Sequence, residues 1–534
     1  MYTSFSKLIS CSLVLIVTTV VFVDRVDASI TEEKDQFRNP VLFADYSDPD
    51  VIRVGADYYL IASSFHFAPG IPILHSKDLV HWRISGHVLD RLSFGPSYNM
   101  DGGNRYGGGV WAPAVRFHNG LFYVYFPTPD EGIFVSTAPK MTGPWNEPKA
   151  ILQGSGWEDP CPFWDDDGKA YLIHSRLGAG PLILHRMAAD GMSLLDDGKV
   201  IIQEPKDLPT LEGPKFYKRN GYYYIFAPFG GVGSGSQAVL RSRNIEGPYE
   251  HHVVLAAGTT GVNGPHQGGY VETPAGEGWF LHFHLQDAHG RIVYLEPVRW
   301  ENDWPLIGDI ASGETIGQPV VRYKIPVAVS ARDRFTPQTS DEFTASVLSP
   351  QWEWNHNPND DHWSLKQRRG YLRMVPSYAE DLLHARNTLT EMMQDDSMAF
   401  TVRLDIDHMH DGDRAGISMF DQQADGIAIV QMNGTRSLSV FDHSGIQSGP
   451  SLNGHLLQLS IHLDGDIVSY FYSLDNGRSF QQLGKPFKAV FGWWKGARPA
   501  LFAFTTNPHS AGKSYVDFDW VHYQALVDAK LTAK

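Results

Sequence analysis

Three acidic residues, Asp48, Asp159 and Glu212, lie at corresponding places in a repeated sequence pattern. Each comes seven to nine residues before a glycine that begins an aromatic, strand-forming run, and a proline follows each acid within two residues. Trp111 and His266 occupy the comparable places in two further copies of the pattern. If the copies surround one axis, these five side chains gather at the mouth of one channel.

Acids gathered in this way could hydrolyse an acetal. Like charges this close cannot all ionise cheaply, so at least one pKa must rise. Cleavage needs one protonated carboxyl to donate to the leaving oxygen, and one ionised carboxyl to act on water or as a nucleophile. A third can tune and orient the acid, and Trp111 offers a wall for a sugar ring. Each acid alone could be a turn or capping residue, but three at matched positions favour catalysis.

The repeat itself predicts the fold. Five segments combine a turn glycine with aromatic, β-rich residues, and they begin at Gly55, Gly120, Gly168, Gly221 and Gly278. Successive glycines are 65, 48, 53 and 57 residues apart. About 50 residues per unit, each with a hairpin core, is typical of a four-stranded propeller blade. We therefore predict an all-β protein with a five-bladed β-propeller over residues 29–325. A large irregular sandwich is the alternative.

The blade spacing does not continue past residue 325. Residues 326–342 contain Pro, Ser and Thr without a strand period, and we interpret them as a linker. Residues 343–534 again alternate apolar and polar side chains, as in 457–472 (LQLSIHLDGDIVSYFY). This pattern predicts a second all-β domain, a two-sheet sandwich.

The chain ends and the composition restrict the location and the partners. The chain has 534 residues with a net charge of −16 and no basic cluster, which excludes a nucleic-acid partner. Residues 1–28 are typical of a secretory signal, with Lys7, an apolar stretch at 12–23 and a small-residue cleavage site at Ala28. That stretch is too short to span a bilayer comfortably, although an uncleaved anchor is the alternative. We expect a secreted or periplasmic protein without membrane attachment, in which Cys161 is a buried structural thiol.

These residues resemble glycoside hydrolase family 43, the five-bladed propeller enzymes that include β-xylosidases and α-L-arabinofuranosidases. The resemblance extends from about residue 39 to the C-terminus. Its most specific segments are YSDPDVI (46–52), GVWAPA (109–114), EDPCPF (158–163) and LEGPKFYKRNGYYY (211–224). For residues 343–534 the resemblance implies the concanavalin A-like β-sandwich of the two-domain members.

The resemblance implies a role for each acid. Asp48 matches the general base, Glu212 the general acid, and Asp159 the residue that tunes the pKa of the acid and orients it. Family members invert the anomeric configuration, with a water between base and sugar. The carboxyl groups of Asp48 and Glu212 should then lie about 6.5–9.5 Å apart.

Other residues receive roles from the same resemblance. His266, in GPHQGG, matches a channel histidine that in some relatives sits beside a calcium or other cation, so His266 is a candidate metal ligand although no cofactor is required. Arg291, in HGRIVYLEP, matches a pocket arginine that contacts substrate. Phe65, Trp111 and His266 are further candidates for substrate contact. The sandwich can narrow the pocket, and 491–494 (FGWW) is the segment that we expect to contribute, a core role being equally open.

Two positions depart from the family pattern. Ala114 stands where an acid often follows the Trp-Ala-Pro motif. Asp50 adds a carboxyl two residues beyond Asp48, and on one strand the two would share a face. Either could then be the base, and Pro49 after Asp48 favours Asp48.

We therefore expect an exported, exo-acting glycosidase that releases terminal β-D-xylose or α-L-arabinofuranose from plant or algal polysaccharides or oligosaccharides. One alternative is a carbohydrate-binding propeller without catalysis, which would gain little from crowded acids. Another is an exo-glycosidase of the same fold that acts on a different glycan. A retaining, fructan-acting propeller would have an Asn-Asp-Pro-Asn-Gly motif, where this chain has SDPDV at 47–51.

Overall fold

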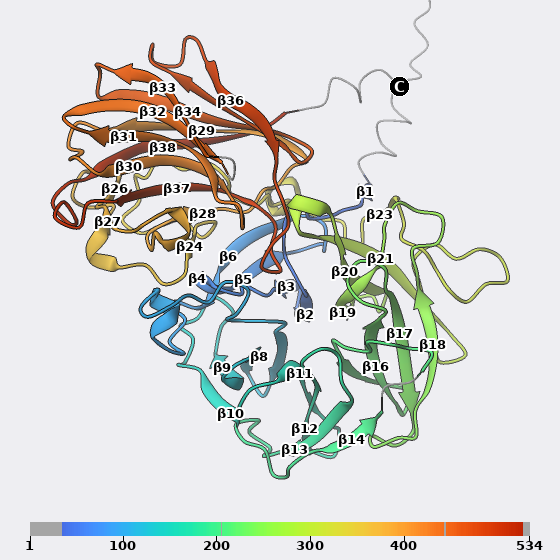
Figure 1. Ribbon diagram of the computed structural model, residues 1–534. Coiled ribbons are helices and arrows are strands. Elements are labelled where there is room, and N and C mark those ends of the chain that lie inside the picture. The colour runs from blue at the N-terminus through green and yellow to red at the C-terminus, as the bar shows by residue number, and fades with distance from the viewer. Residues whose placement is uncertain (1–34, 204–205, 443–444, 527–534) are drawn as a thin grey trace, which may run out of the picture.

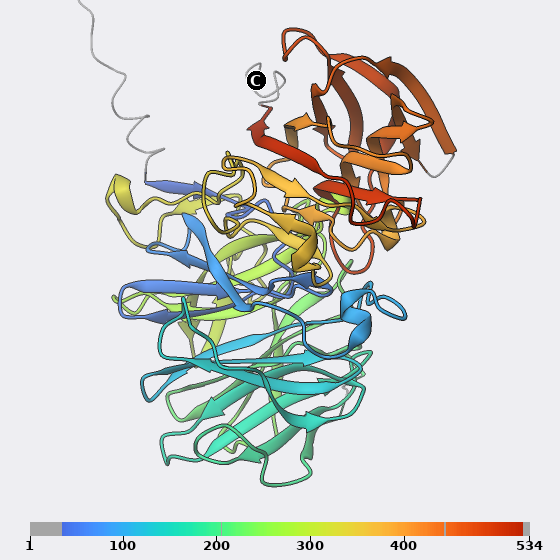
Figure 2. The same ribbon diagram turned by 90° about the vertical axis from the view of Figure 1, so that its left-hand side faces the viewer.

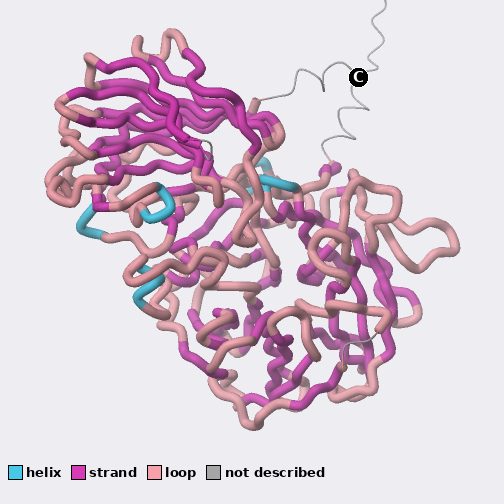
Figure 3. Tube along the Cα trace, viewed as in Figure 1, coloured by secondary structure: helices cyan, strands magenta, loops and turns pink. Residues whose placement is uncertain are grey.

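The computed structural model describes residues 35–203, 206–442 and 445–526. The predicted signal, residues 1–28, lies outside these ranges. Strands form most of the regular structure, and the helices are short 3-10 turns (Figure 3). These are η1 (Pro96–Asn99), η2 (Asp287–His289), η3 (Ala331–Asp333), η4 (Asp360–His362) and η5 (Leu382–His384). Within the described ranges, no helix is long and apolar enough to cross a membrane.

Among the described residues, positions 50–307 contain five four-stranded antiparallel sheets arranged in a ring (Figure 1). The first blade is β2 (Asp50–Val54), β3 (Asp57–Ile61), β5 (Gly70–Ser76) and β6 (Trp82–Leu89). The second is β7 (Ala114–His118), β8 (Leu121–Thr128), β9 (Gly132–Ala138) and β10 (Lys149–Gln153). The third is β11 (Trp157–Trp164), β12 (Ala170–Arg176), β13 (Leu182–Met187) and β14 (Lys199–Ile202). The fourth is β15 (Lys215–Arg219), β16 (Tyr222–Phe229), β17 (Ser236–Ser242) and β18 (Glu250–Leu255), and the fifth is β19 (His266–Glu272), β20 (Gly278–Leu285), β21 (Arg291–Glu301) and β22 (Trp304–Ile307).

The first strand of each blade lines the central axis. β2 packs beside β7 and β19, and β11 packs beside β7 and β15. The repeated glycines mark the turn from this first strand to the second. At Asn119-Gly120 and Asn220-Gly221 both residues have positive φ, as the tightest hairpin turns require. The hairpin repeat is therefore what sets the blade count.

The N-terminal segment closes the ring. β1 (Gln36–Arg38) pairs with β23 (Arg322–Lys324), which follows the last blade. The Asn39 amide nitrogen donates to the carbonyls of Leu295 and Val320 at 3.0 and 2.9 Å, and its oxygen accepts from Leu295 N at 2.9 Å. The two ends of the propeller sequence are thus tied together by backbone and side-chain hydrogen bonds.

The second domain is a two-sheet sandwich, so the predicted fold class is confirmed. One sheet contains β33 (Gly445–Leu452), β32 (Thr435–Asp442), β31 (Asp425–Met432), β30 (Asp413–Phe420), β37 (Arg498–Thr505), β28 (Leu389–Thr390) and β24 (Glu353–Asn355), with β27 (Ser377–Tyr378) beside β37. The other contains β25 (Trp363–Ser364), β26 (Leu372–Met374), β38 (Val516–Ala525), β29 (Ser397–Asp405), β34 (Leu456–Asp464), β35 (Ile467–Ser473) and β36 (Gln481–Lys488). Leu404, Ile417 and Phe518 are among the fully buried side chains between the sheets.

The two domains share one sheet. Strand β4 (Phe67–Ala68), from the first blade segment, pairs with β24 at the edge of the sandwich. Figure 2 shows the sandwich, orange to red, packed against one side of the propeller. Because backbone hydrogen bonds join the domains, the sandwich has a fixed position relative to the propeller axis.

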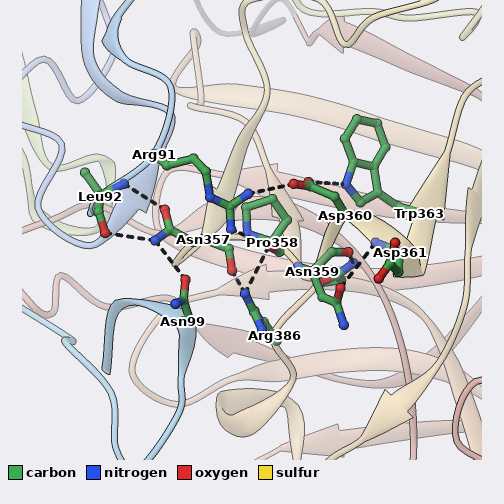
Figure 4. Close-up of polar contacts among 11 residues, drawn as sticks. Arg91, Leu92, Asn99, Asn357, Pro358, Asn359, Asp360, Asp361, Trp363 and Arg386 are labelled. Atoms are coloured by element: carbon green, nitrogen blue, oxygen red, sulfur yellow. Dashed lines mark hydrogen bonds and ion pairs between the residues drawn. The ribbon is translucent and has the colours of Figure 1, made fainter. Parts of the chain in front are cut away.

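Loops of both domains add polar contacts to this interface (Figure 4). Asn357 Oδ1 accepts from Leu92 N at 2.8 Å, and Asn357 Nδ2 donates to Leu92 O at 2.9 Å. Nearby, Arg91 Nη1 lies 2.8 Å from Asp360 Oδ2. The side chain of Asn357 is buried and its polar atoms are paired, so this contact stabilises domain docking.

Candidate active site

A cavity of about 290 Å³ lies at one end of the propeller axis. All seven side chains singled out in the sequence line it: Asp48, Phe65, Trp111, Asp159, Glu212, His266 and Arg291. Five of them, Asp48, Trp111, Asp159, Glu212 and His266, lie at or near the beginning of the innermost strands of the five blades, Phe65 follows β3 and Arg291 begins β21. A larger cavity of about 1210 Å³ lies against the fifth blade, and its lining shares none of these seven. Convergence of the acids, rather than volume, identifies the candidate site.

Asp48 is held firmly from two sides. Its Oδ2 accepts from Ser63 Oγ at 2.5 Å, and its Oδ1 accepts from Arg291 Nη1 at 2.8 Å. The side chain is buried, and the backbone has a φ of +53° just before β2 begins. Both carboxyl oxygens of Asp48 are therefore fixed in place by neighbouring donors.

Asp50 occupies a different environment. It is fully buried and does not line the cavity, and its Oδ2 accepts from Val115 N at 2.9 Å and from Arg116 Nη1 at 2.7 Å. The prediction that Asp48 and Asp50 share a strand face is wrong, because β2 begins only at Asp50. Only Asp48 therefore lies where a base would be needed.

The pair of Asp50 and Arg116 joins inner strands of the propeller. Arg116 Nη2 donates to Cys161 Sγ at 3.0 Å, and Cys161 is buried as predicted. These three residues belong to the inner strands of blades one to three. Arg116 itself lines separate cavities of about 480 and 370 Å³ and is absent from the lining of the acidic cavity. The acidic cavity therefore shares no lining residue with either of them.

Asp159 lies at the centre of the acidic group. It accepts from Ser175 Oγ at 3.1 Å, from Gly213 N at 3.0 Å and from Gln267 Nε2 at 3.2 Å. Burial raises the pKa of Asp159 to about 6, and the charges of Glu212 and Asp48 act in the same direction. A carboxyl group with this pKa can bind or release a proton near neutral pH.

Glu158 is an acid that the sequence interpretation missed. It lines the cavity beside Asp159 and accepts from Ala179 N at 3.0 Å. Burial, and then the charge of Asp159, raise the pKa of Glu158 to about 9. Neighbouring residues of a regular strand point to opposite faces, but the pairing of β11 with β12 shifts register between Glu158 and Cys161, and Asp159 has a φ of +55°. This irregularity lets both acids reach one cavity.

Glu212 is the most accessible of the clustered acids. About 22% of its side chain is exposed, and its carboxyl joins those of Glu158 and Asp159 with one oxygen from each within 4.8 Å of the others. Such a trio of oxygen atoms could hold a metal ion. Among the described residues, Asp48 is not a member of that trio.

His266 lies beside this trio rather than within it. Its Nε2 is 3.1 Å from Glu212 Oε1, in a direction that does not satisfy hydrogen-bond geometry. Both ring nitrogens are buried, and neither has a hydrogen-bond partner in the described chain. His266 can therefore take a ligand atom from the cavity side.

Aromatic residues form the opposite wall. The rings of Phe65 and Trp111 are 5.9 Å apart, and a backbone bridge joins Phe65 to Val110. Gly109 makes this approach possible, because a Cβ there would lie 2.1 Å from Phe65 O. The indole of Trp111 lies 6.3 Å from that of Trp494, which comes from the second domain. Such surfaces suit the apolar faces of a sugar ring.

The loop at 491–494 (FGWW) takes both roles left open by the sequence. Trp494 lines the cavity, is 46% exposed, and lies 5.7 Å from the Arg291 guanidinium. Trp493 instead stacks on Tyr106 at 4.1 Å, inside the domain interface. One tryptophan therefore borders the cavity and its neighbour anchors the loop.

Comparison with known proteins identifies the class. The model of the family described as glycosyl hydrolases family 43 matches residues 37–305. The model described as beta xylosidase C-terminal concanavalin A-like domain matches residues 340–524. The chain belongs to glycosyl hydrolase family 43, and the protein is a glycosidase.

Individual relatives extend the comparison over both domains. A putative beta-xylosidase of Xylanibacter ruminicola is 42% identical over 86% of this chain and 85% of its own. A non-reducing end alpha-L-arabinofuranosidase of Bacteroides ovatus is 32% identical over 65% of this chain and 66% of its own. A solved structure of a bifunctional GH43-CE protein of Bacteroides eggerthii has a TM-score of 0.82 and 29% identity over 92% of this chain and 64% of that longer one.

Proposed function

We propose that the protein releases single terminal β-D-xylose or α-L-arabinofuranose units from xylan-derived oligosaccharides of plant or algal origin, with inversion at the anomeric carbon. The observation that supports this most is the cavity of about 290 Å³, which has Asp48, Asp159 and Glu212 in its lining. A cavity of this size suits one terminal sugar unit rather than a long stretch of chain. Relatives named as a beta-xylosidase and an alpha-L-arabinofuranosidase support the same pentose class.

In the proposed reaction Glu212 donates its proton to the glycosidic oxygen as the bond to the anomeric carbon breaks. Asp48 accepts a proton from the water whose oxygen forms the new bond on the opposite face. Glu212 suits this role because its side chain is the most exposed of the clustered acids. The oxygen of the leaving group can therefore reach its carboxyl. Asp159 acts through Glu212, orienting it and responding to its charge within the trio.

The walls of the cavity position the sugar. Phe65, Trp111 and Trp494 offer apolar faces, while Arg291 and His266 offer polar atoms. Arg291 also holds Asp48, so a substrate hydroxyl that contacts the guanidinium would lie close to the proposed base. This arrangement favours a single pentose ring at the bottom of the site.

We propose that catalysis itself requires no metal ion. A divalent cation such as Ca²⁺ would be held by oxygens of Glu158, Asp159 and Glu212 next to His266, and it would neutralise part of the crowded negative charge. Such a cation would compete with the proton that Glu212 has to donate, so the proton transfers assigned to Asp48 and Glu212 proceed without it. Dialysis against EDTA should therefore leave kcat unchanged; a loss that Ca²⁺ restores would contradict this proposal.

The decisive experiment compares aryl β-xyloside and aryl α-arabinofuranoside, with NMR of the first-formed anomer of the released sugar. The proposal predicts turnover of at least one substrate with an inverted product. A product of retained configuration, or binding of xylo-oligosaccharides without any release, would contradict it. Glu212→Gln should fold normally but should not cleave unactivated oligosaccharides. Wild-type turnover in that variant would show that Glu212 is not the general acid.

We also propose that the protein is exported. The support is the signal-like sequence at residues 1–28. N-terminal sequencing of the protein recovered outside the cytoplasm should begin after Ala28, whereas an intact Met1 would contradict cleavage.

A further inference from the structure

A lysine of the second domain is buried next to the proposed base. Lys495 is only 2% exposed, and its Nζ lies 2.9 Å from Asp45 Oδ2. The same Nζ donates to the backbone carbonyls of Asp45 at 2.8 Å and of Ser63 at 3.4 Å. Lysine is rarely fully buried, and its charge must then be compensated. All of these partners belong to the propeller, within the segment that surrounds Asp48.

The partners of Lys495 are the residues that fix Asp48. Asp45 Oδ1 accepts from Arg291 N at 2.9 Å, and the Arg291 side chain donates to one oxygen of Asp48. Ser63, whose carbonyl contacts Lys495, donates its hydroxyl to the other oxygen of Asp48. Both oxygens of Asp48 are therefore oriented by groups that Lys495 holds, directly or through Asp45.

The packing leaves little room for another arrangement. Gly496 N donates to Asp45 Oδ2 at 3.0 Å, next to the Lys495 contact. At Gly290, just before Arg291, a Cβ would lie 2.5 Å from Asp45 Cγ, and φ is +79°. A tight turn bridges Gly492 and Lys495. A shift of the lysine would thus move Asp45 and, with it, the backbone that places Arg291.

We propose that Lys495 is a positioning residue for Asp48, so that the sandwich domain orients the proposed general base as well as bordering the pocket. This inference rests on the proposed function, in which Asp48 activates water. Lys495 does not line the cavity and acts on Asp48 through Asp45, Ser63 and Arg291, and its Nζ also lies 5.8 Å from the ring of Phe65. A base misplaced by about 1 Å can lower the rate of a reaction by about two orders of magnitude.

The interface supplies a matched control. Asn357 also joins the domains and is buried, but its partners Leu92 and Asn99 do not contact the residues around Asp48 (Figure 4). Loss of either contact should weaken domain docking. Only loss of the Lys495 contact should change the orientation of Asp48.

The test uses the full-length enzyme and the better of the two aryl glycosides, well below the melting temperatures of all variants. Lys495→Met should lower kcat at least about thirtyfold, with a much smaller change in KM. Asn357→Ala should lower the melting temperature while kcat stays within about twofold of wild type. Equal losses of kcat in both variants, or a wild-type kcat in Lys495→Met, would overturn the inference.

Two further variants cover the case in which Lys495→Met does not fold. Asp45→Asn keeps an acceptor for Arg291 N but loses the charge that pairs with Lys495, and it should lower kcat about tenfold. In Lys495→Ala, added propylammonium should restore kcat in a saturable way. A wild-type kcat in Asp45→Asn would overturn the inference. A wild-type enzyme that hydrolyses neither glycoside would overturn the proposed function and this inference with it, whereas an active wild type with unaffected variants would overturn the inference alone.

Discussion

Buried acids in two regions of the molecule have opposite properties because of their neighbours. In the cavity, Glu158 and Asp159 lie among other acids, and burial raises the pKa values to about 9 and about 6. At the domain interface, burial acts in the same direction on Asp45 and Glu353, but positive neighbours outweigh it. Lys495 and Arg498 lower the pKa of Asp45, and Arg498 lowers that of Glu353. Glu353 reaches about 2, with His87 contributing.

The two groups of acids affect the stability of the fold in opposite directions. A carboxyl with a raised pKa disfavours folding at neutral pH, since the unfolded chain would ionise it freely. A carboxyl with a lowered pKa favours folding under the same conditions. The acids of the cavity therefore weaken the fold at neutral pH, and the interface charges contribute in the other direction.

Removing the proposed base should have the largest effect on activity. Asp48→Asn should lower kcat by about three orders of magnitude, because general-base catalysis contributes about that much. Its melting temperature should fall as well, because the buried Arg291 loses its charged partner at 2.8 Å. Steady-state assays with both aryl glycosides check the first point and calorimetry checks the second.

The neighbouring acid gives a control for that prediction. Asp50→Asn should act on stability instead, because it leaves Arg116 buried without its partner. A variant of Asp50 that folds well but has lost the activity seen in wild type would reassign the base to Asp50.

Removing an interface acid should give the next largest effect, on stability alone. Glu353→Gln leaves Arg498 without its 2.6 Å partner, and both side chains are buried. We expect a loss of about 3 kcal/mol in the free energy of unfolding. Calorimetry measures this loss. A kcat that falls along with stability, at temperatures where the variant is folded, would contradict a purely structural role.

The pair of Glu353 and Arg498 makes the free energy of unfolding depend on pH at low pH. The pKa of Glu353 in the folded state, about 2, is below its usual value, so its stabilisation is complete above about pH 5 and is lost as the pH falls toward 2. Wild type should lose more stability over this range than Glu353→Gln. Thermal melts at half-unit pH intervals measure the difference, and parallel curves for the two proteins would contradict the assignment.

Removing a cavity acid should stabilise the protein slightly. The folded-state pKa of Glu158 is raised, so its cost is absent below the usual pKa of Glu and grows as the pH rises toward about 9. Glu158→Gln should be more stable than wild type at pH 8 and equally stable at pH 4. Glu314→Gln, in an exposed loop, should change neither value. A loss of stability in Glu158→Gln at pH 8 would contradict the prediction that the ionised carboxyl of Glu158 weakens the fold.

The sequence predicted those features that repeat. Equivalent places in successive blades located Asp48, Trp111, Asp159, Glu212 and His266, because a propeller brings such places to one axis. The position of Trp494 could also be predicted, since an aromatic loop late in a two-domain chain suggests a contact with the pocket.

Features that depend on local irregularity or on distant pairing were not predictable. Glu158 reaches the cavity only through the register shift of β11, which strand alternation does not reveal. Asp45 and Lys495 are 450 residues apart, and nothing in one sequence distinguishes their pairing from any other. The sequence alone does not distinguish the roles of Asp48 and Asp50, because the distinction depends on the residue at which β2 begins.

The separation of the acidic cavity from the cavities around Arg116 has a consequence for how a polymer would be shortened. The lining of the acidic cavity shares no residue with theirs, so in the proposed reaction a released sugar would leave through the opening by which the chain entered. The chain would then withdraw first, and the monosaccharide would follow it. Degradation would accordingly be distributive, with one unit removed per encounter and intermediates of every length accumulating in solution.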